Sequence, residues 1–355
     1  MNVLFVFYVP SGGVETLNRQ RSKALKPAGI DCDFLYYSKK RSLINHESNV
    51  FITNNDQEIK KILAAKFYSA IVIISDYVGI ERFRKLGYKG KIIFEVQGYG
   101  AKHVARSEMK KAIPYINNYC DGLLYPKTQH IGEIFKEFFP TVPKFAFNNC
   151  FDSLEFTYKA QVIKESSPII AWIGRLEDNK NWREFLEIGN RLVIKNPLIK
   201  LYMFEDPSLS TIQERNEFNK TVTKFNLQKK LSILQNIPHQ YMPAYFSKIG
   251  DSGGLLCSTS KVEGAPYSIL EAMSCNCPIL TTDSDGVRTS VIHNHTGKYY
   301  RIGNINEAVN QAEELIFNKP LRNKIIYNAS LHVKSQFSHE QYQEHFVKML
   351  RSIGV

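Results

Sequence analysis

The chain has 355 residues, of which 43% are hydrophobic and 23% charged, and its formal net charge is +12. These values are typical of a globular protein, and the length fits two domains better than one core. No apolar run approaches the roughly 20 residues that cross a bilayer, and the first residues lack a basic region and a cleavage site. We therefore expect neither a membrane span nor a signal peptide.

The positive charge is concentrated in the first part of the chain. Residues 1–150 hold 22 Lys and Arg against 13 Asp and Glu, a net of +9, whereas residues 151–355 hold 24 against 21, a net of +3. We expect this basic half to face an anionic membrane surface or a phosphate-bearing acceptor, with a solvated basic face as the alternative. Nucleic acid is not expected, because zinc-finger, RNA-binding and helix-turn-helix patterns are absent. The candidate membrane-facing cations are Lys102, Arg106, Lys110 and Lys111.

The first 150 residues alternate between buried strands and helices. The apolar run over residues 2–8 predicts a strand buried on both faces, Pro10-Ser-Gly-Gly13 breaks it, and residues 14–25 follow as a helix. Further strands are expected over 31–37, 70–74, 91–96 and 122–125, and a helix capped by Thr128 over 129–138. This order predicts a mostly parallel α/β domain with a phosphate-binding turn at its start. The dinucleotide fingerprint G-x-G-x-x-G is absent, which argues against an oxidoreductase.

A second α/β run follows a change in composition. Residues 148–167 are polar and lack periodicity, so we interpret them as a linker. Strands are then expected over 169–173, 199–204, 231–234, 254–257 and 278–282, with helices over 182–194 and 211–225. Residues 306–350 are expected to be helical in two or three pieces.

Two carboxylates lie eight residues apart across a predicted loop and helix. Glu263 precedes Gly264 and Pro266, which interrupt regular structure, and the helix is expected to begin near Tyr267 and to carry Glu271 one turn in. A helix start offers unpaired N–H groups and the positive end of the dipole. An anion such as a phosphorylated sugar would then be held with a carboxylate on either side. The alternative is a surface glutamate and a solvated helix glutamate.

This stretch resembles a known signature. Glu263-Gly-Ala-Pro-Tyr-Ser-Ile-Leu-Glu271, continuing into Ala-Met, looks like the E-x7-E motif of retaining family 4 glycosyltransferases, which belong to glycosyl transferases group 1 and have the GT-B fold. Gly12-Gly13 resembles the N-terminal glycine loop of that family. Gly174-Arg175-Leu176 with Lys180 resembles G-R-L-x-x-x-K, and Phe337-Ser-His339 resembles the final F-S-W, with His in place of Trp. Together these matches cover nearly the whole chain.

The resemblance implies two Rossmann-like domains that face each other across a cleft. Residues 1–150 would bind the acceptor, residues 151–335 the nucleotide sugar, and residues 336–355 would form a helix that crosses back onto the first domain. The implied activity is metal-independent, retaining transfer of a hexosyl group from a UDP- or GDP-sugar to a cell-envelope glycan, a lipid-linked acceptor or a secondary metabolite. No cofactor and no metal is implied. The expected location is the cytoplasm, including the inner face of the membrane.

The resemblance also assigns roles to residues. Arg175 and Lys180 would meet the diphosphate, Glu263 the hydroxyls of the donor sugar, and Glu271 the ribose. Residues expected around the donor are Gly12, Gly13, Gly174, Gly264, Ala265, Pro266, Tyr267 and Ser268. Relatives place a His after the fourth core strand, near the donor sugar, and here Gln97, His103 or neither would replace it. The later Gly-Gly-x-x-Glu pattern of the family is reduced to Asp285-Gly286.

Metal and redox patterns are weak, and two other functions remain. Asp31-Cys-Asp33 and Asp283-Ser-Asp285 resemble the D-x-D metal motif of another glycosyltransferase fold, but we interpret both as structural. Cys275 and Cys277 lack a second pair at zinc spacing, and the six scattered cysteines favour a reducing cytoplasm. The alternatives to a transferase are a sugar-nucleotide epimerase of the same fold and a non-catalytic, sugar-nucleotide-binding partner subunit.

Overall fold

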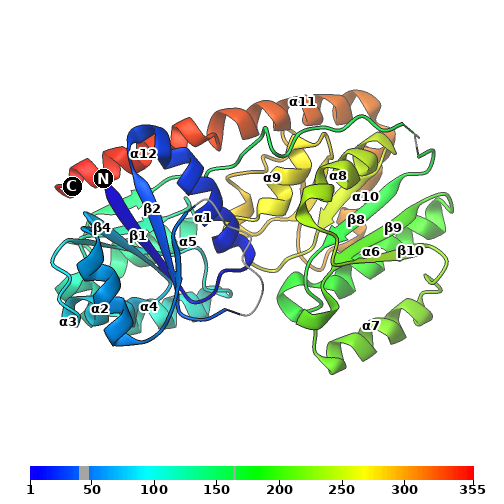
Figure 1. Cartoon of the computed structure of the whole chain (residues 1–355). Helices are drawn as coiled ribbons and strands as arrows, with labels where there is room; N and C mark the ends of the chain where they lie inside the picture. The colour runs from blue at the N-terminus through cyan, green and yellow to red at the C-terminus, as the bar shows by residue number, and fades with distance from the viewer. Residues whose placement is uncertain (40–47, 163–164) are drawn as a thin grey trace. The chain divides into compact units, whose positions relative to one another are not determined.

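The computed structural model describes residues 1–39, 48–162 and 165–355 (Figure 1). These residues divide into two compact units. Unit 1 comprises Met1–Asp152 together with Gln336–Val355, and unit 2 comprises Ser153–Ser335. The linker expected over residues 148–167 includes residues 163 and 164, which lie outside the described residues.

Within the described part of unit 1, the strands form one seven-stranded sheet in the order β3-β2-β1-β4-β5-β6-β7, and all neighbours are parallel. The strands are β1 (Asn2–Phe7), β2 (Asp31–Tyr36), β3 (Val50–Ile52), β4 (Ala70–Ile74), β5 (Lys91–Glu95), β6 (Gly122–Tyr125) and β7 (Lys144–Ala146). The central strands are apolar on both faces because helices cover both faces. The direction of winding reverses between β1 and β4, and such a switch point is where open α/β sheets bind ligands, beyond the carboxyl ends of the strands.

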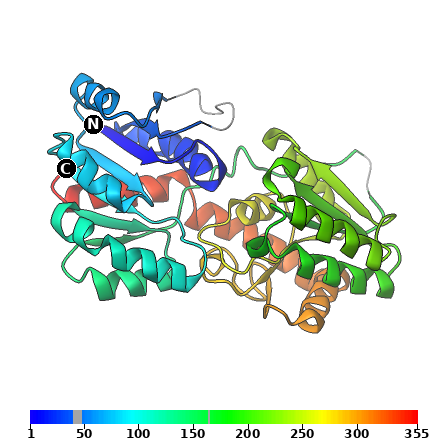
Figure 2. The ribbon, with the colours of Figure 1, turned by 90° about the horizontal axis from the view of Figure 1, so that it is seen from below.

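Two groups of helices cover the unit 1 sheet. The helices are α1 (Gly12–Leu25), η1 (Lys26–Ala28), α2 (Asp56–Ala65), α3 (Tyr77–Lys85), α4 (Lys102–Tyr119), α5 (Gln129–Phe138) and α12 (His339–Ser352). One core joins Leu4 and Val6 of β1 to apolar residues of α2, α3, α4 and α5. On the other face α12 runs along α1, and Phe346 packs on Phe5 with ring centroids 6.0 Å apart (Figures 1 and 2). The C-terminal helix thus packs beside α1 on one face of the sheet, against the first strand of the chain.

Unit 2 repeats this architecture. Its described residues form a six-stranded sheet in the order β10-β9-β8-β11-β12-β13, again with parallel neighbours. The strands are β8 (Ile169–Ile173), β9 (Lys200–Glu205), β10 (Leu231–Gln235), β11 (Leu255–Ser258), β12 (Ile279–Thr282) and β13 (Lys298–Tyr300). The switch point lies between β8 and β11, so the loops that follow these two strands emerge side by side.

Helices and short 3-10 turns connect the unit 2 strands. The helices are α6 (Trp182–Lys195), α7 (Ile212–Lys224), α8 (Met242–Asp251), α9 (Tyr267–Ser274), α10 (Ile305–Phe317) and α11 (Lys319–Gln336). The turns are η2 (Asp178–Lys180), η3 (Pro207–Leu209), η4 (His239–Tyr241) and η5 (Asp285–Val287). A core that includes Trp172, Trp182 and Phe185 packs α6 and α10 against the sheet.

The structure confirms most of the predicted elements and adds others. The helix after Glu263 begins at Tyr267, as expected, and the C-terminal helical region falls into three helices. The sequence did not predict β3, β7 and β13, which have three residues each, or helices α2 and α8. Helix α1 begins at Gly12, two residues earlier than expected, so the glycine pair forms its first turn. Thr128 precedes α5, but the described residues show no capping hydrogen bond from its side chain, and its hydroxyl donates to the carbonyl oxygen of Pro126 (2.7 Å).

No helix among the described residues is both long enough and apolar enough to cross a membrane.

Candidate functional site

The loop after β8 turns back sharply at Gly174. A Cβ atom at this position would lie 2.9 Å from the ring of Trp172 and 3.2 Å from Cγ of Lys180, so a larger residue would displace one of them. The turn η2 follows, and Asn181 then adopts a left-handed conformation (φ 51°), which Asn tolerates better than most residues. The result is that Lys180 lies over the carboxyl end of β8.

Hydrogen bonds fix the loop after β11 to the loop after β8. The hydroxyl of Thr259 accepts from Nε1 of Trp172 (3.0 Å) and donates to the carbonyl oxygen of Lys180 (2.8 Å). The backbone N–H of Lys261 donates to the carbonyl oxygen of Asn179 (2.8 Å), and Nδ2 of Asn179 donates to the carbonyl oxygen of Val262 (3.1 Å). The two loops therefore form one rigid unit at the switch point of the sheet.

This rigid unit brings Lys180 and Glu263 together. The Nζ atom of Lys180 lies 2.5 Å from Oε1 of Glu263, and the two side chains are 24% and 12% exposed. Sequence motifs 83 residues apart thus meet in one charge-assisted contact. Arg175, the other predicted cation, instead pairs with Glu177 at 2.9 Å, and its side chain is 53% exposed. The structure brings two of the three predicted catalytic residues together and places Arg175 nearer to solvent.

Gly286 packs against the backbone of the Glu263 loop and forms a hydrogen bond with it. Its backbone N–H donates to the carbonyl oxygen of Glu263 (3.1 Å). A Cβ atom at residue 286 would lie 2.1 Å from the carbonyl oxygen of Gly264 and 2.2 Å from that of Glu263, closer than any real contact. Only glycine therefore allows η5 to approach this loop. The sequence indicated Asp285-Gly286 as the remnant of a family pattern but gave no contact for it.

Glu271 projects from α9, whose N-terminus has no side-chain cap among the described residues. The N-cap residue is Pro266, and no acidic side chain lies in the first turn of α9. The side chain of Glu271 is 6% exposed and lies 2.9 Å from Nε2 of His239 in η4. Because a carboxylate only accepts hydrogen bonds, Nε2 is the protonated nitrogen of this contact. His239 is a residue that the motif does not contain.

His239 is itself held by an aromatic contact. Its ring centroid lies 4.7 Å from that of Phe156, which is buried at the start of unit 2. The hydroxyl of Ser274, at the end of α9, donates to the carbonyl oxygen of Phe156 (2.5 Å). Phe156, His239 and α9 therefore form one cluster that fixes the carboxylate of Glu271.

Four of the predicted residues belong to unit 1. Gly12, with φ at +73°, and Gly13 form the start of α1, directly beyond the carboxyl end of β1. Gln97 follows β5, where its Nε2 donates to Oε1 of Glu95 (2.6 Å) and its Oε1 accepts from Nδ2 of Asn149 (2.7 Å). His103 lies in the first turn of α4 and is exposed. Of the two substitutes for the family histidine, Gln97 is fixed in orientation and His103 faces solvent.

One aspartate of each D-x-D sequence is bonded to protein side chains, and the cysteine pair is buried. Asp33 is buried and accepts from Tyr68 (2.6 Å), Lys66 (2.9 Å) and Asn49 (3.2 Å). Asp283 pairs with both Nε and Nη2 of Arg288 (2.8 and 2.7 Å). Burial raises the pKa of the Cys275 and Cys277 thiols to about 12. Among the described residues, no three His, Cys, Asp or Glu side chains form a group that could hold a metal ion.

Comparisons with known proteins match this site to one family. A family model described as glycosyl transferases group 1 matches residues 155–332, which are 178 of the 355 residues. The capsular polysaccharide biosynthesis glycosyltransferase CapM of Staphylococcus aureus is 23% identical over 181 residues, which cover 51% of this chain and 45% of that protein. The chain spans less than half the length of the curated relatives that it matches.

Solved structures match over the whole chain. Sucrose-phosphate synthase from Thermosynechococcus elongatus superposes with a TM-score of 0.84 over 99% of each chain, at 16% identity. Anabaena HepE, solved in complex with UDP and glucose, superposes with a TM-score of 0.83 over 99% of this chain and 100% of its own, at 15% identity. At these identities the likeness shows the fold, and it confirms the expected two-domain α/β architecture of GT-B type. Because the family model covers half of the chain, the protein belongs to the glycosyl transferases group 1 family.

Proposed function

We propose that this protein is a metal-independent, retaining glycosyltransferase that moves a hexosyl group from a UDP- or GDP-sugar to an acceptor hydroxyl. The observation that carries the proposal is the contact between Lys180 and Glu263, and Glu263 lies four residues before the first residue of α9. A cation, a carboxylate and a helix start in one place suit a diphosphate that carries a sugar. The complex of HepE with UDP and glucose supports a UDP-sugar as the first donor to test.

Unit 2 would bind the nucleotide sugar. Lys180 would exchange its contact with Glu263 for the diphosphate, and the backbone N–H groups of Ala265, Tyr267 and Ser268 would complete the anion site. Glu271, oriented by His239, would accept hydrogen bonds from the ribose hydroxyls. Glu263 would then be free to meet the hydroxyls of the donor sugar. Arg175 would add a second positive charge near the leaving group once it separates from Glu177.

Retention requires attack on the face from which the nucleotide leaves. The bond between the anomeric carbon and the phosphate oxygen breaks, and a bond to the acceptor oxygen forms on the same face. The acceptor proton passes to the departing phosphate oxygen, so no carboxylate nucleophile is needed. The role of the protein is to stabilise the negative charge on the diphosphate and to orient both substrates.

Unit 1 would bind the acceptor. Gly12, Gly13, Gln97 and His103, which the resemblance assigns to donor binding, follow β1 and β5 in the chain. We propose a cell-envelope glycan, free or lipid-linked, as the first acceptor class, and the match to CapM supports this choice. A secondary metabolite is the other class to test. A cytoplasmic location suits the six free cysteines, five of which are buried.

Thermal shift with nucleotides and nucleotide sugars is the first test. A ligand at 100 times its dissociation constant stabilises the native state by about 2.7 kcal/mol, so the true donor should raise the melting temperature clearly. Transfer is then followed with the best donor, with and without a metal chelator, and NMR reads the anomeric configuration of the product. Inversion or loss of activity on chelation would contradict the mechanism. Conversion of the donor to an isomer without an acceptor would indicate an epimerase, and binding without turnover a non-catalytic subunit.

A further inference from the structure

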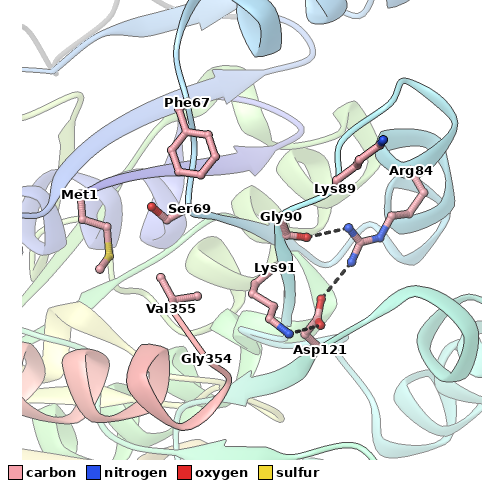
Figure 3. A pocket seen from close by; sticks show the side chains of 10 residues that line it. All are labelled: Met1, Phe67, Ser69, Arg84, Lys89, Gly90, Lys91, Asp121, Gly354 and Val355. Atoms are coloured by element: carbon pink, nitrogen blue, oxygen red, sulfur yellow. Dashed lines mark hydrogen bonds and ion pairs between the residues drawn. The ribbon is translucent and has the colours of Figure 1, made fainter.

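An exposed aromatic side chain stands between two basic hollows at the amino end of the unit 1 sheet. Phe67, in the loop between α2 and β4, is 79% exposed. A hollow of about 370 Å³ on one side of it is lined also by Arg84, Lys89 and Lys91 (Figure 3). A second hollow of about 370 Å³ is lined by Phe67 and Lys89 together with Lys60. We call Lys60, Phe67 and Lys89, with the two hollows, the amino-edge face.

Hydrogen bonds to the backbone hold this face in shape. The hydroxyl of Tyr88 donates to the carbonyl oxygen of Tyr68 (3.0 Å), which ties the loop before β5 to the loop that carries Phe67. Arg84 donates from Nη1 to the carbonyl oxygen of Gly90 (2.6 Å) and pairs through Nη2 with Asp121 (2.9 Å) (Figure 3). The loops are thus fixed from within, while the ring of Phe67 points outward.

The amino-edge face carries unneutralised positive charge. Lys60 and Lys89 are exposed, and within the described residues neither forms an ion pair. Arg84 and Lys91 share one carboxylate, that of Asp121, so this group keeps an excess of one positive charge. The described part of the face therefore carries cations around the exposed ring of Phe67, and Leu63 and Leu86 line one hollow beside that ring.

The surface on α4 that the sequence indicated is less suited to an anionic partner. Arg106 is paired with Glu137 (Nη1 to Oε2, 2.8 Å), and Lys111 with Glu108 (2.7 Å). At least two of its four cations are thus already matched by carboxylates. The amino-edge face is therefore a better candidate than α4 for contact with an anionic partner.

We propose that the amino-edge face docks on an anionic phospholipid surface, with Phe67 in the headgroup region and Lys60 and Lys89 on lipid phosphates. Phe side chains of interfacial segments bury at the boundary between headgroups and acyl chains, and each nearby Lys is attracted by anionic lipid. The exposed Lys60 and Lys89 near the Phe67 ring match lipid phosphates in charge, which is the ground for choosing a lipid surface. The carboxyl ends of the strands lie at the other edge of the sheet, so docking leaves Gly12 and Gln97 uncovered. The proposal goes beyond the proposed activity and does not depend on it.

Sedimentation with vesicles tests the proposal on the full chain without any nucleotide sugar. Vesicles are made of phosphatidylcholine alone or mixed with phosphatidylglycerol. We expect binding to the mixed vesicles only, weakening as salt shortens the Debye length from about 30 Å at 0.01 M to about 8 Å at 0.15 M. The Lys60→Ala, Lys89→Ala double variant should bind about 25-fold more weakly, from about fivefold per cation. Phe67→Ala should lose about tenfold through its lost apolar contact.

A matched double variant on α4, Lys102→Ala with Lys110→Ala, removes the same charge and should bind as wild type does. A Phe67→Trp variant adds an independent signal, since the two native tryptophans, Trp172 and Trp182, are buried in unit 2. Its emission should shift to the blue on mixed vesicles and stay unchanged on neutral ones.

The proposal is overturned if the wild-type protein does not bind mixed vesicles. In that case the amino-edge face would contact an acidic protein or only solvent. It is equally overturned if the α4 variant loses as much binding as the amino-edge variant. Loss with the lysine variant but no blue shift and no effect of Phe67→Ala would overturn the placement of the ring in the interface.

Discussion

Two ion pairs, one in each unit, join similar groups in different surroundings. In unit 1, Nη1 and Nη2 of Arg21 donate to the two carboxylate oxygens of Glu95, both at 2.8 Å, and the side chains are 0% and 1% exposed. In unit 2, one contact of 2.5 Å joins Lys180 to Glu263, at 24% and 12% exposure. We refer to these as the buried pair and the loop pair.

The neighbours of each pair show what it is for. Arg21 also lies over the ring of Phe5 (4.6 Å), and Glu95 accepts from Gln97, so the buried pair has further partners inside the core. The loop pair lies between two loops at the carboxyl edge of a sheet, with solvent on one side. Under the proposed function a ligand anion would replace Glu263 as the partner of Lys180, whereas the side chain of Arg21 is fully buried. We therefore expect burial and the number of contacts to separate a structural ion pair from one that a substrate opens.

The largest expected effect comes from breaking the buried pair. Glu95→Gln leaves the Arg21 charge buried without a counter-charge, which should lower the free energy of unfolding by about 3–5 kcal/mol. The same change in the loop pair, Glu263→Gln, should cost about 1 kcal/mol or less. Urea denaturation of both variants measures the two values. Equal losses would mean that exposure does not separate the pairs.

Gly286→Ala should move the loop pair without touching the buried pair. The added Cβ cannot fit against the carbonyl oxygens of Glu263 and Gly264, so the loop must shift. A displacement of about 1 Å at a reacting centre can cost about 100-fold in rate, and we expect a loss of that size in glycosyl transfer. Transfer kinetics together with the melting temperature test this. A folded variant with the wild-type rate would show that Gly286 does not position Glu263.

The two cations of the G-R-L-x-x-x-K match should differ in strength. Lys180→Ala removes a partly buried cation and should weaken UDP binding by about 1.5–3 kcal/mol, or about 10- to 150-fold. Arg175→Ala should weaken it by about fivefold or less, because this side chain is more than half exposed and already paired. Both variants should keep the wild-type stability. Calorimetry with UDP gives the dissociation constants, and unchanged affinity in both would remove the two residues from the site.

A similarly small effect is expected from the residue that orients Glu271. His239→Ala removes one hydrogen bond to that carboxylate and should weaken UDP binding by about 1 kcal/mol, or about fivefold. His239→Gln keeps a donor at this position and should recover part of the loss. Titration with UDP compares the three proteins. An alanine variant that binds like wild type would leave His239 as a packing residue only.

The sequence predicted the parts of the fold that are long and buried. Strands β4 and β6 and helix α5 fall on the expected residues, because apolar runs and helix spacing survive in any tertiary context. Edge strands β3, β7 and β13 escaped prediction, since three residues are too few to show a period. Helix α2 had a usable signal, because Asn55 accepts from the N–H groups of Gln57 and Glu58 as an N-cap.

The motifs located the candidate site residues but not their partners. They indicated Lys180, Glu263 and Glu271, and the contact between the first two follows from the parallel order of β8 and β11. No spacing links His239 to Glu271, and no local pattern reveals that Gly286 approaches another backbone. Both contacts arise from tertiary structure alone, so a single sequence could not predict them.

The central claim is that Glu263 and Glu271 hold different parts of one donor. The direct test is isothermal titration with bare UDP, alongside transfer rates, for Glu263→Gln and Glu271→Gln. Glu271→Gln should weaken bare UDP and the UDP-sugar alike, by about 1.5–3 kcal/mol, through its lost contact with ribose. Glu263→Gln should leave bare UDP binding nearly intact and lower turnover, because its contact with the sugar strengthens as positive charge develops at the anomeric carbon. Equal loss of bare UDP binding in both variants, or wild-type behaviour in both, would contradict the claim.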